Sequence, residues 1–422
     1  MIEREKQGYQ EVHLGPKTIQ APVEWNFERA NKLFDIEKDR IKPSELDEES
    51  VFLYSMPAFD EDKEPVEINP GEIGSKKYRV PEDTLLFPKL NIRKQRFWRV
   101  KNAQDLSLCS TEYWPLLTKK DIDLTFYLYY FNSYQFMSNP KVSSSSSTNS
   151  HKRVDEDSFK RIKLPVPPLP EQRKIAEILS TVDEAIKQTE EVIETSKELK
   201  QGLMQDLLTK GIGHDEFKEV RLGPREVEVP SDWEKSQLGD LADYLNGYAF
   251  SSDNWSDQGL PIIRIQNLTG SPGEETNYYD GDDLDERYIV EPDDLLVSWS
   301  ATLGVFRWDG PKAALNQHIF KVEPNEDEVN EDFLYHLLHR NVERLEQKKQ
   351  GSTMQHITKS TFEGSFVVLP EKKEQRKIAE ILSTVDEKIR QEEEYKQKLE
   401  ELKKGLMQDL LKGKVRVNDL ID

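Results

Sequence analysis

The 422-residue sequence contains a single cysteine, Cys109, and only seven histidines. One cysteine excludes an intramolecular disulfide framework and a cysteine metal cluster, and the histidines are not spaced as metal ligands usually are. No apolar run approaches the length of a membrane span, and the first ten residues do not resemble a signal peptide. We therefore expect a cytoplasmic protein that binds no metal and no other cofactor.

Sequence motifs for common enzyme chemistry are also missing. The sequence has no GxxxxGK[ST] phosphate loop and no GxGxxG motif. It has no Asn-Pro-Pro-aromatic tetrad of adenine methyltransferases, because Asn139-Pro140 is followed by Lys141. Glu346-Gln347-Lys348 has the E-x-K spacing of some nucleases, but it extends a predicted helix. The sequence thus predicts a protein that is not itself an enzyme.

The charge is strongly negative. The formal net charge of −21 argues against a uniformly basic nucleic-acid-binding protein, although local basic patches remain possible. Charged residues make up 33% and hydrophobic residues 36% of the chain, which suits long exposed helices. The length leaves room for two or three domains.

A long repeat organises the chain. Residues 171–184 and 374–387 both have the sequence EQRKIAEILSTVDE, and residues 202–208 and 405–411 both have the sequence GLMQDLL. Both blocks recur at an offset of 203 residues (374 − 171 and 405 − 202), so they align without a gap. A repeat of this length indicates an internal duplication.

Each copy has the a/d stripe of a coiled coil, with apolar residues at alternating four- and three-residue steps. The first stripe comprises Ile175, Leu179, Val182, Ile186, Thr189, Ile193, Ser196, Leu203 and Leu207. The second comprises Ile378, Leu382, Val385, Ile389, Leu399, Leu406 and Leu410, with Glu392 and Lys396 on the seam. We expect the two helices, each roughly 60 Å long, to pack antiparallel on each other. The alternative is two separate coiled coils that recruit other proteins.

The remaining sequence forms two globular regions with corresponding features. Trp233 corresponds to Trp25, and residues 293–308 parallel residues 82–98. Amphipathic helices are expected over 123–136 and 331–345, and strands over 51–59, 84–87, 261–268 and 314–322. The predicted fold class is α+β, with two similar mixed α/β domains joined by two long antiparallel coiled-coil helices in a pseudo-twofold duplication. The predicted boundaries are 1–160 and 213–370 for the domains, and 161–212 and 371–422 for the helices.

Two similar but diverged domains on closely matching helices suit a protein that reads two different DNA half-sites at a fixed spacing. Half-sites lie at multiples of about 34 Å. Arg, Lys, Asn and Gln contact base edges, whereas Ser, Thr and backbone N–H groups hold phosphates. Double-stranded DNA is therefore the predicted ligand.

Basic and amide-rich segments supply the candidate DNA-binding residues. In the first domain these are Lys89, Asn91, Arg93, Lys94, Arg96, Asn149, His151, Lys152 and Arg153. In the second domain they are Asn246, Tyr248, Arg264, Gln266, Asn267, Ser298, Ser300, Thr302, Asn316, Gln317, Lys348, Lys349, Ser352, Thr353 and Gln355, with His318 and His356 as further possible contacts. The alternative for the RKQRF segment is the solvated face of a strand. Asn267 could instead cap a turn, and Asn316 could bond to backbone at a strand end.

Several segments resemble the specificity (S) subunit of type I restriction-modification systems. They are LPVPPLPEQRKIAEILSTVDEAI, VVLPEKKEQRKIAEILSTVDEKI, both GLMQDLL endings, SDWEKSQLGDL, GYAF and IIRIQNL. The resemblance covers nearly all of residues 160–422 and is weaker over residues 1–159. The second copy departs from the family pattern by an apparent insertion of residues 371–373 between Pro370 and Glu374.

The resemblance implies two target-recognition domains that each read one half of an asymmetric bipartite site, with no catalytic residues in the chain. It implies two methyltransferase (M) and two restriction (R) subunits as partners. In that family the complex methylates adenine with S-adenosylmethionine and cuts DNA with ATP and Mg. Identical exposed positions in the repeat are the expected M contacts: Arg173, Lys174, Glu177, Asp183, Arg376, Lys377, Glu380 and Asp386. The alternative is a recent duplication that has not yet diverged.

Two other functions remain open from the sequence. The first is a DNA-binding scaffold outside restriction, or a specificity subunit that pairs only with a methylase. The second is a nuclease that acts alone. An adjacent methyltransferase gene would favour the specificity subunit, and metal-dependent DNA cutting by the purified chain would favour the nuclease.

Overall fold

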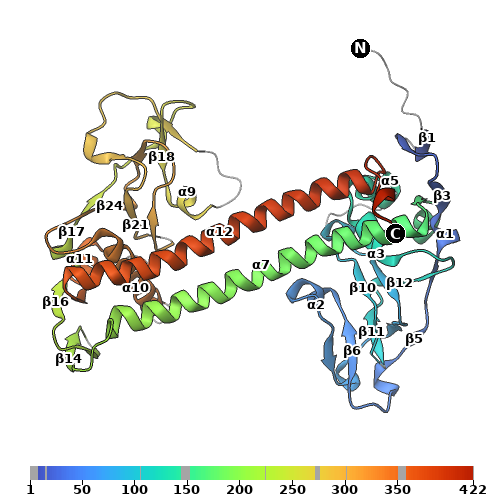
Figure 1. The fold of residues 1–422 in the computed structure, drawn as a ribbon, viewed down its shortest axis with the longest axis horizontal. Coiled ribbons are helices and arrows are strands. Elements are labelled where there is room, and N and C mark those ends of the chain that lie inside the picture. Colours follow the sequence, from blue (N-terminus) through green and yellow to red (C-terminus); the bar gives the residue numbers. More distant parts are fainter. Residues whose placement is uncertain are drawn as a thin grey trace. The chain divides into compact units, whose positions relative to one another are not determined.

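The computed structural model (Figure 1) describes residues 8–14, 17–104, 106–143, 153–223, 225–270, 276–300, 302–349 and 358–421. The chain forms two compact units: the first comprises Met1–Glu190 and Tyr395–Asp422, and the second Glu191–Glu394. The unit boundaries fall inside the two long helices. Each unit thus contains a part of each long helix.

The first unit is a mixed α/β domain that also contains the start of α7 and the end of α12. Its elements are β1 Tyr9–Leu14, β2 Lys17–Pro22, β3 Asn26–Arg29, α1 Ala30–Leu33, β4 Phe34–Ile36, β5 Arg40–Ile41, η1 Pro43–Glu45, β6 Val51–Tyr54, α2 Met56–Glu61, β7 Val66–Ile68, η2 Pro70–Glu72, β8 Lys77–Arg79, β9 Thr84–Pro88, η3 Ile92–Lys94, β10 Trp98–Val100, β11 Ser107–Ser110, β12 Tyr113–Thr118, α3 Leu124–Asn132, α4 Tyr134–Met137, α5 Pro140–Ser143, α6 Glu156–Lys160 and β13 Lys163–Val166. The helix α7 is Leu169–Lys210, α12 is Lys372–Leu410, and η6 is Asn418–Leu420.

The second unit repeats this plan. Its elements are β14 Phe217–Leu222, β15 Arg225–Pro230, β16 Glu234–Gln237, α8 Leu238–Leu241, β17 Ala242–Asn246, η4 Ser252–Asn254, β18 Leu260–Ile263, α9 Ile265–Thr269, β19 Tyr278–Tyr279, η5 Glu286–Tyr288, β20 Ile289–Val290, β21 Leu295–Ser298, β22 Gly304–Arg307, β23 Ala313–Leu315, β24 Ile319–Pro324, α10 Glu331–Lys349, α11 Lys359–Glu363 and β25 Phe366–Leu369.

The sheets confirm the duplication that the sequence predicts only weakly outside the helices. The order β10-β9-β12-β4 in the first unit matches β22-β21-β24-β17 in the second. The other sheet, β5-β8-β11-β6-β7, matches β20-β23-β18-β19 apart from the extra strand β5. The central pairs β11·β6 and β23·β18 are both parallel. The fold is therefore α+β, as expected.

Three predicted strands are wrong in part, each because a local polar group turns the chain. Residues 51–59 end as a strand at Tyr54, since the Ser55 hydroxyl accepts the Ala58 N–H (3.2 Å) and starts α2. Residues 261–268 leave β18 after Ile263, and the Asn267 side chain caps α9 at Arg264. Residues 314–322 divide between β23 and β24, which belong to different sheets.

The predicted helices are confirmed with one difference. Helix α10 spans the expected residues 331–345 and continues to Lys349. The helix expected over residues 123–136 is divided into α3 and α4 at Ser133, whose hydroxyl accepts the Phe136 N–H at 3.3 Å. Side-chain hydroxyls of this kind favour helix starts over helix interiors.

The two long helices run antiparallel within each unit, as expected. In the first unit Lys403 pairs with Asp183 and Lys396 with Glu190, so residue numbers fall along α12 as they rise along α7. In the second unit Lys200 pairs with Asp386 at 2.5 Å. Lys200–Asp386 and Lys403–Asp183 are the same pair at the 203-residue offset. Lys200 stands between Ser196 and Leu203 of the apolar stripe, so this stripe position carries an ion pair instead of an apolar side chain.

A glutamate at the start of each helix, fully buried at Glu171 and half-buried at Glu374, ties the helix to the domain core. The Glu171 carboxylate accepts the Trp25 indole N–H (3.0 Å) and the Arg416 Nε–H (2.6 Å). Glu374 accepts the Trp233 indole N–H at 3.3 Å. The correspondence of the two tryptophans is thereby confirmed.

The glutamines that follow show that the two helix starts align without an insertion. Gln172 donates to the Pro167 carbonyl and Gln375 to the Pro370 carbonyl, both across five residues. Pro370 is therefore the counterpart of Pro167, and residues 371–373 replace residues 168–170. The insertion inferred between Pro370 and Glu374 was wrong. Helices α7 and α12 begin at Leu169 and Lys372, which are also 203 residues apart.

Helix α10 of the second unit carries two histidines, of which His336 is fully buried and His339 half-buried. Asp123 and Asn330 correspond, because their backbone N–H groups donate to the corresponding side chains of Gln172 (2.9 Å) and Gln375 (2.8 Å). Tyr129 and His336 each stand six residues later and therefore also correspond. The Tyr129 hydroxyl donates to Asp183 at 2.7 Å, whereas His336 Nδ1 lies 3.8 Å from Asp386. Burial lowers the pKa of His336 to about 3 and that of His339 to about 4.

We expect the free energy of unfolding to fall as the pH drops from 6.5 toward 4. The unfolded chain binds protons at these histidines in this window and the folded chain does not, so this stability is complete only above pH 6.5. His336→Tyr should reduce the slope by about 1.4 kcal/mol per pH unit. Urea unfolding at pH 7, 6 and 5 measures this, with the exposed His13→Tyr as the control. If the free energy of unfolding changed equally with pH in the wild type, His336→Tyr and His13→Tyr, the prediction would be contradicted.

No helix in the described ranges is both long enough and apolar enough to cross a membrane.

Candidate nucleic-acid interface and partner surface

In the second unit the loops at one end of both sheets converge. Ile263 of β18 lies beside Leu315 of β23 in the parallel pair. Asn246 pairs with Phe320, and Ser298 pairs with Ile319, at the start of β24. Because residues 316–318 cross from one sheet to the other at this point, the loops after β17, β18 and β21 meet around them. We call this edge the strand-end cluster of the second unit.

Backbone hydrogen bonds fix the strand-end cluster. The Tyr248 N–H donates to the Leu315 carbonyl (2.7 Å), and the Gln317 N–H donates to the Tyr248 carbonyl (2.9 Å). The Asn316 N–H donates to the Ile263 carbonyl (3.2 Å). A Cβ at Gly247 would overlap the carbonyls of Leu315 and Asn316, so only glycine permits this close approach.

Amides and aromatic rings reach solvent at this edge. Asn246, Tyr248 and Gln317 are exposed, and Asn316 is half-buried. The Arg264 guanidinium lies 5.5 Å from the centre of the exposed Trp255 ring. The structure brings these residues together, as a base- or phosphate-contacting surface requires. Sequence reasoning missed Trp255, because an isolated tryptophan in a polar segment has no periodic signal.

Other candidates of the second unit have internal roles. Ser298 is fully buried and donates to the Thr302 carbonyl (2.7 Å), and Ser300 is also buried. Thr302 itself is exposed, and Gln266 is half-buried. Asn267 accepts the Arg264 N–H (2.9 Å), and the Asn316 side chain accepts the His318 N–H (3.4 Å), so the capping alternatives hold for both. His318 is exposed beside Trp299, whose ring stacks on Phe320.

The first unit has an equivalent edge around residues 111–112, where the chain crosses from β11 to β12. The Lys89 N–H donates to the Glu112 carbonyl (2.9 Å), and Leu90 bridges to Arg153. The Arg153 guanidinium donates to the Glu112 carboxylate at 2.7 and 3.0 Å. We call this edge the strand-end cluster of the first unit.

Basic residues of the RKQRF segment divide between surface and core. Asn91 and Gln95 adopt left-handed conformations (φ 51° and 52°) that bracket η3 and leave Arg93 and Lys94 exposed. Within the described ranges, Arg93 and Lys94 form no ion pair. Arg96 is buried and donates to Asp60 of α2 (2.6 Å). This internal pair accounts for Arg96, which we leave out of the interface.

Several predicted residues lie outside the described ranges: Asn149, His151, Lys152, Ser352, Thr353, Gln355 and His356. The backbone of Lys348 and Lys349 ends α10, and their side chains also lie outside the description.

The predicted partner residues fall into two groups. Arg173, Glu177, Arg376, Lys377 and Glu380 are exposed, and Lys174 is half-buried beside Glu177 at 3.1 Å. Asp183 and Asp386 instead pair within the chain. Their identity in the two copies therefore has a structural cause, which sequence comparison could not separate from partner binding.

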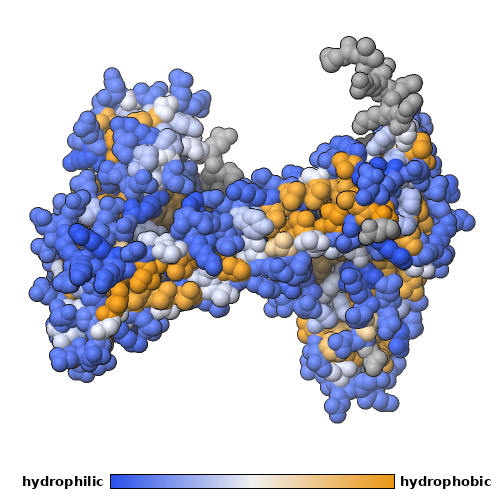
Figure 2. Space-filling view, viewed as in Figure 1, coloured by the Kyte–Doolittle hydropathy of each residue, from blue (hydrophilic) through white to orange (hydrophobic). Residues whose placement is uncertain are grey.

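A second outward face of each helix is also duplicated. Val192 and Leu199 of α7 are 38% and 54% exposed, and the corresponding Tyr395 and Leu402 of α12 are 51% and 50% exposed. Gly202 and Gly405 lie three residues further along the same faces and have nothing within 4 Å of an added Cβ. Figure 2 shows apolar side chains at the surface along these helices. We call these faces the apolar helix faces.

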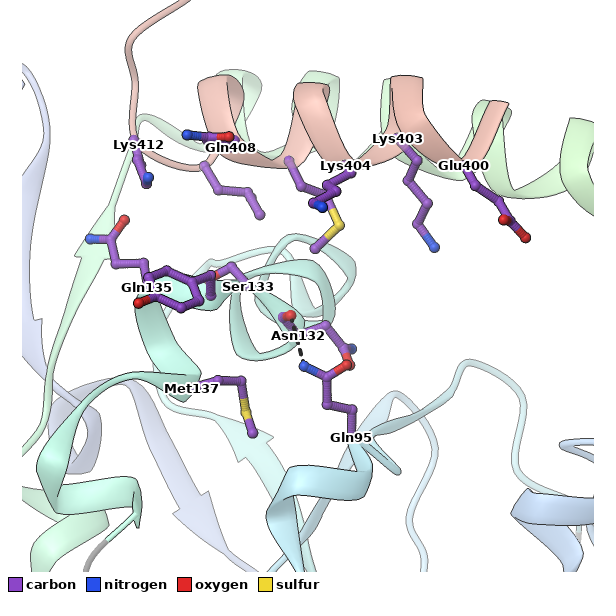
Figure 3. A pocket seen from close by; sticks show the side chains of 13 residues that line it. Gln95, Asn132, Ser133, Gln135, Met137, Glu400, Lys403, Lys404, Gln408 and Lys412 are labelled. Atoms are coloured by element: carbon purple, nitrogen blue, oxygen red, sulfur yellow. Dashed lines mark hydrogen bonds between the residues drawn. The ribbon is translucent and has the colours of Figure 1, made fainter. Parts of the chain in front are cut away.

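A pocket of about 560 Å³ in the first unit lies between α4 and the end of α12 (Figure 3). Met137, Met407 and Leu411 line it, with Lys404 and Lys412 on the side of α12. In the second unit the continuous helix α10 places Arg340 ten residues after Asn330, and its guanidinium donates to the Leu208 carbonyl. Ser133 stands at the corresponding place in the first unit. The pocket is thus the space that an arginine fills in the second unit.

Three polar side chains near the start of α12 are close enough to hold a metal ion. Donor atoms of His214, Asp232 and Glu374 all lie within 4.8 Å of one another. His214 Nε2 lies 2.9 Å from Glu374, which also accepts the Ile212 N–H at 2.8 Å. The sequence did not suggest this group. Since Arg416 fills the same place at Glu171, we interpret His214 as the hydrogen-bonding partner of Glu374.

The comparisons place these features in a family. The family described as "Type I restriction modification DNA specificity domain" matches residues 22–195 and 230–401, so the chain belongs to it. It is 30% identical to the putative type I restriction enzyme MjaX specificity subunit of Methanocaldococcus jannaschii, over 63% of this chain and 62% of that protein. The MjaVIII specificity subunit of the same organism is 29% identical over 63% and 65%. The aligned part thus spans less than two thirds of these relatives.

Solved structures show the same fold. The S subunit of the type I restriction-modification system from M. genitalium aligns with a TM-score of 0.61 at 15% identity, over 94% of this chain and 98% of that one. A chain from a study of assembly and conformational transition of the type I system aligns with a TM-score of 0.54 at 19% identity, over 94% and 99%.

Proposed function

We propose that this chain is the DNA-recognition subunit of a type I restriction-modification complex. Each strand-end cluster reads one half of an asymmetric bipartite site in double-stranded DNA. The observation that carries the proposal is the contrast within the duplication. The long helices form corresponding ion pairs at the 203-residue offset, Lys200–Asp386 and Lys403–Asp183. In contrast, the loops between corresponding strands differ in sequence: residues 89–96 between β9 and β10, and residues 299–303 between β21 and β22.

The contact residues proposed for the first half-site are Lys89, Asn91, Arg93, Lys94 and Arg153. Those for the second are Asn246, Tyr248, Arg264, Gln317 and Thr302, with Trp255 and His318 added. Arginine and amide side chains form bidentate contacts with base edges, and each is worth about 1–3 kcal/mol of discrimination. The net charge of −21 predicts weak DNA binding by the isolated chain, because affinity depends on phosphate neutralisation.

The chain carries no chemistry of its own in this proposal. Two methyltransferase subunits supply adenine methylation with S-adenosylmethionine, and two restriction subunits supply ATP- and Mg-dependent cutting. The methyltransferase subunits dock on surfaces that the two helices share, namely the exposed residues Arg173, Lys174, Glu177, Arg376, Lys377 and Glu380 and the apolar helix faces. Duplicated apolar residues exposed on a helix are typical of docking surfaces.

Gly202 and Gly405 provide a test of the docking surface. Glycine inside a helix costs about 0.5–1 kcal/mol relative to alanine, and both sites have space for a methyl group. We expect Gly202→Ala with Gly405→Ala to stabilise the chain by about 1–2 kcal/mol yet weaken co-purification of the methyltransferase. Urea unfolding and pull-down measure the two effects. If co-purification of the methyltransferase were stronger or unchanged, the two glycines would not be part of the docking surface.

A map of methylated adenines in the source genome, with and without this gene, tests the function. We expect one asymmetric bipartite motif to lose its methylation when the gene is deleted. A methyltransferase that co-purifies without any cleavage activity would indicate a specificity subunit paired only with a methylase. Metal-dependent cutting by the purified chain alone, with no change in methylation, would overturn the proposal.

A further inference from the structure

A cavity of about 330 Å³ lies in the second unit, between the β14–β15 hairpin, α10 and the connection from α11 to β25. Arg225 reaches it from the hairpin and Arg344 from α10. Asn341, Thr361 and Ser365 add an amide and two hydroxyls, and Phe366 contributes an aromatic ring. None of the described residues that line the cavity is acidic, although the chain as a whole carries a net charge of −21.

The two arginines have no acidic partner among the residues that the structure describes. Within the described ranges, neither Arg225 nor Arg344 forms an ion pair, and Arg344 is half-buried. Burial lowers the pKa of Arg344, and the charge of Arg225 lowers it further. Arg340, one turn earlier on α10, adds a third guanidinium whose pKa is lowered to about 9 by burial and then by Arg344. Two partly desolvated guanidinium groups with a third, exposed one beside them are unfavourable unless an anion compensates their charge.

The described part of the first unit lacks the arginine that α10 supplies to this cavity. Met137 stands fourteen residues after Asp123, where Arg344 stands fourteen residues after Asn330. The cavity is therefore not one of the features that the two units share through the duplication. Its lining residues also do not include any residue of the strand-end cluster of the second unit.

We propose that this cavity binds a phosphoryl group carried by a small ligand, such as inorganic phosphate or a nucleoside monophosphate. Two guanidinium forks match the geometry of tetrahedral oxyanions, and the Asn341 amide adds a further hydrogen-bond donor. The volume lies at the lower end of small-ligand pockets, which span about 300–1,000 Å³. Phe366 offers an apolar surface beside the anion site, with Lys235 Nζ 3.9 Å from its ring centre. This inference does not rest on the proposed DNA recognition.

The test uses the full chain with inorganic phosphate and with AMP as probes, against potassium chloride at equal ionic strength. Titration calorimetry should give saturable binding in the wild type. Arg225→Gln and Arg344→Met should each weaken it at least tenfold, and Arg161→Gln, an exposed arginine of the first unit, should leave it unchanged. Without phosphate, Arg225→Gln should raise the melting temperature, because it relieves repulsion between the arginines.

Arg225 is exposed on a hairpin, so its variant keeps the test valid if Arg344→Met fails to fold. A wild type that binds neither phosphate nor AMP would overturn the proposal. It would also be overturned if the arginine variants changed only the affinity for duplex DNA, because the cavity would then be part of the nucleic-acid surface. If Arg161→Gln weakened binding as strongly as Arg225→Gln, the binding would reflect general attraction to positive charge, and the proposal would be overturned.

Discussion

Replacing Glu171 by alanine is expected to lower the free energy of unfolding by about 3 kcal/mol, at the lower end of the effect of breaking a buried ion pair. Glu171 is fully buried and receives hydrogen bonds from Trp25 and Arg416. Without it, the Trp25 indole N–H and the Arg416 guanidinium lose their partner in the core. Urea or guanidinium unfolding of the full chain measures the change.

Glu177→Ala is the matched control on the same helix. Its partner Lys174 lies 3.1 Å away, but the Glu177 side chain is 64% exposed, so the loss should stay below about 1 kcal/mol. Equal losses in the two variants would mean that Glu171 does not tie α7 to the first domain.

Changing a single exposed side chain in one strand-end cluster is expected to relax one half of the DNA site only. Gln317→Ala removes an exposed amide that can contact a base edge in a bidentate manner, and Arg93→Ala removes an exposed guanidinium in the other unit. Each should lower methylation of the original motif roughly 5- to 150-fold, the equivalent of about 1–3 kcal/mol. Adenine mapping in cells that carry each variant measures this.

The two variants control for each other. Gln317→Ala should tolerate new bases in one half-site, and Arg93→Ala in the other half-site. If both variants lowered methylation of every sequence evenly, the residues would contact phosphates rather than bases. If both altered the same half-site, the assignment of one half-site to each unit would be wrong.

Much of the frame could be predicted because duplication and helical periodicity are visible in one sequence. The 203-residue offset located both helices, and the stripe from Ile175 to Leu207 gave their buried face. Strand ends were harder, because Ser55, Asn267 and Asn316 turn the chain through side-chain hydrogen bonds that no periodic pattern reveals. The apparent insertion after Pro370 arose from matching the wrong proline, which only the glutamine hydrogen bonds corrected.

The proposed site was predictable in composition but not in placement. Asn246, Tyr248, Arg264 and Gln317 meet because the chain crosses between two sheets at residues 316–318, a topological feature. Arg96 and Asp183 have the same residue types as surface contacts, yet Asp60 and Lys403 occupy them internally. The paired partners lie 36 and 220 residues away in sequence, so no local pattern indicates them.

The composition of the first unit has a consequence for synthesis on the ribosome. Its core includes Trp25, Ile175 and Leu179 together with Leu410, Leu411 and Val417. The second unit is a single continuous segment, Glu191–Glu394, and can form all its internal contacts as soon as that segment has emerged. The first unit must wait for residues 395–422, although most of it is made earlier. The domain translated first is therefore completed last, and its apolar helix positions stay uncovered during translation, when exposed hydrophobic surface favours aggregation.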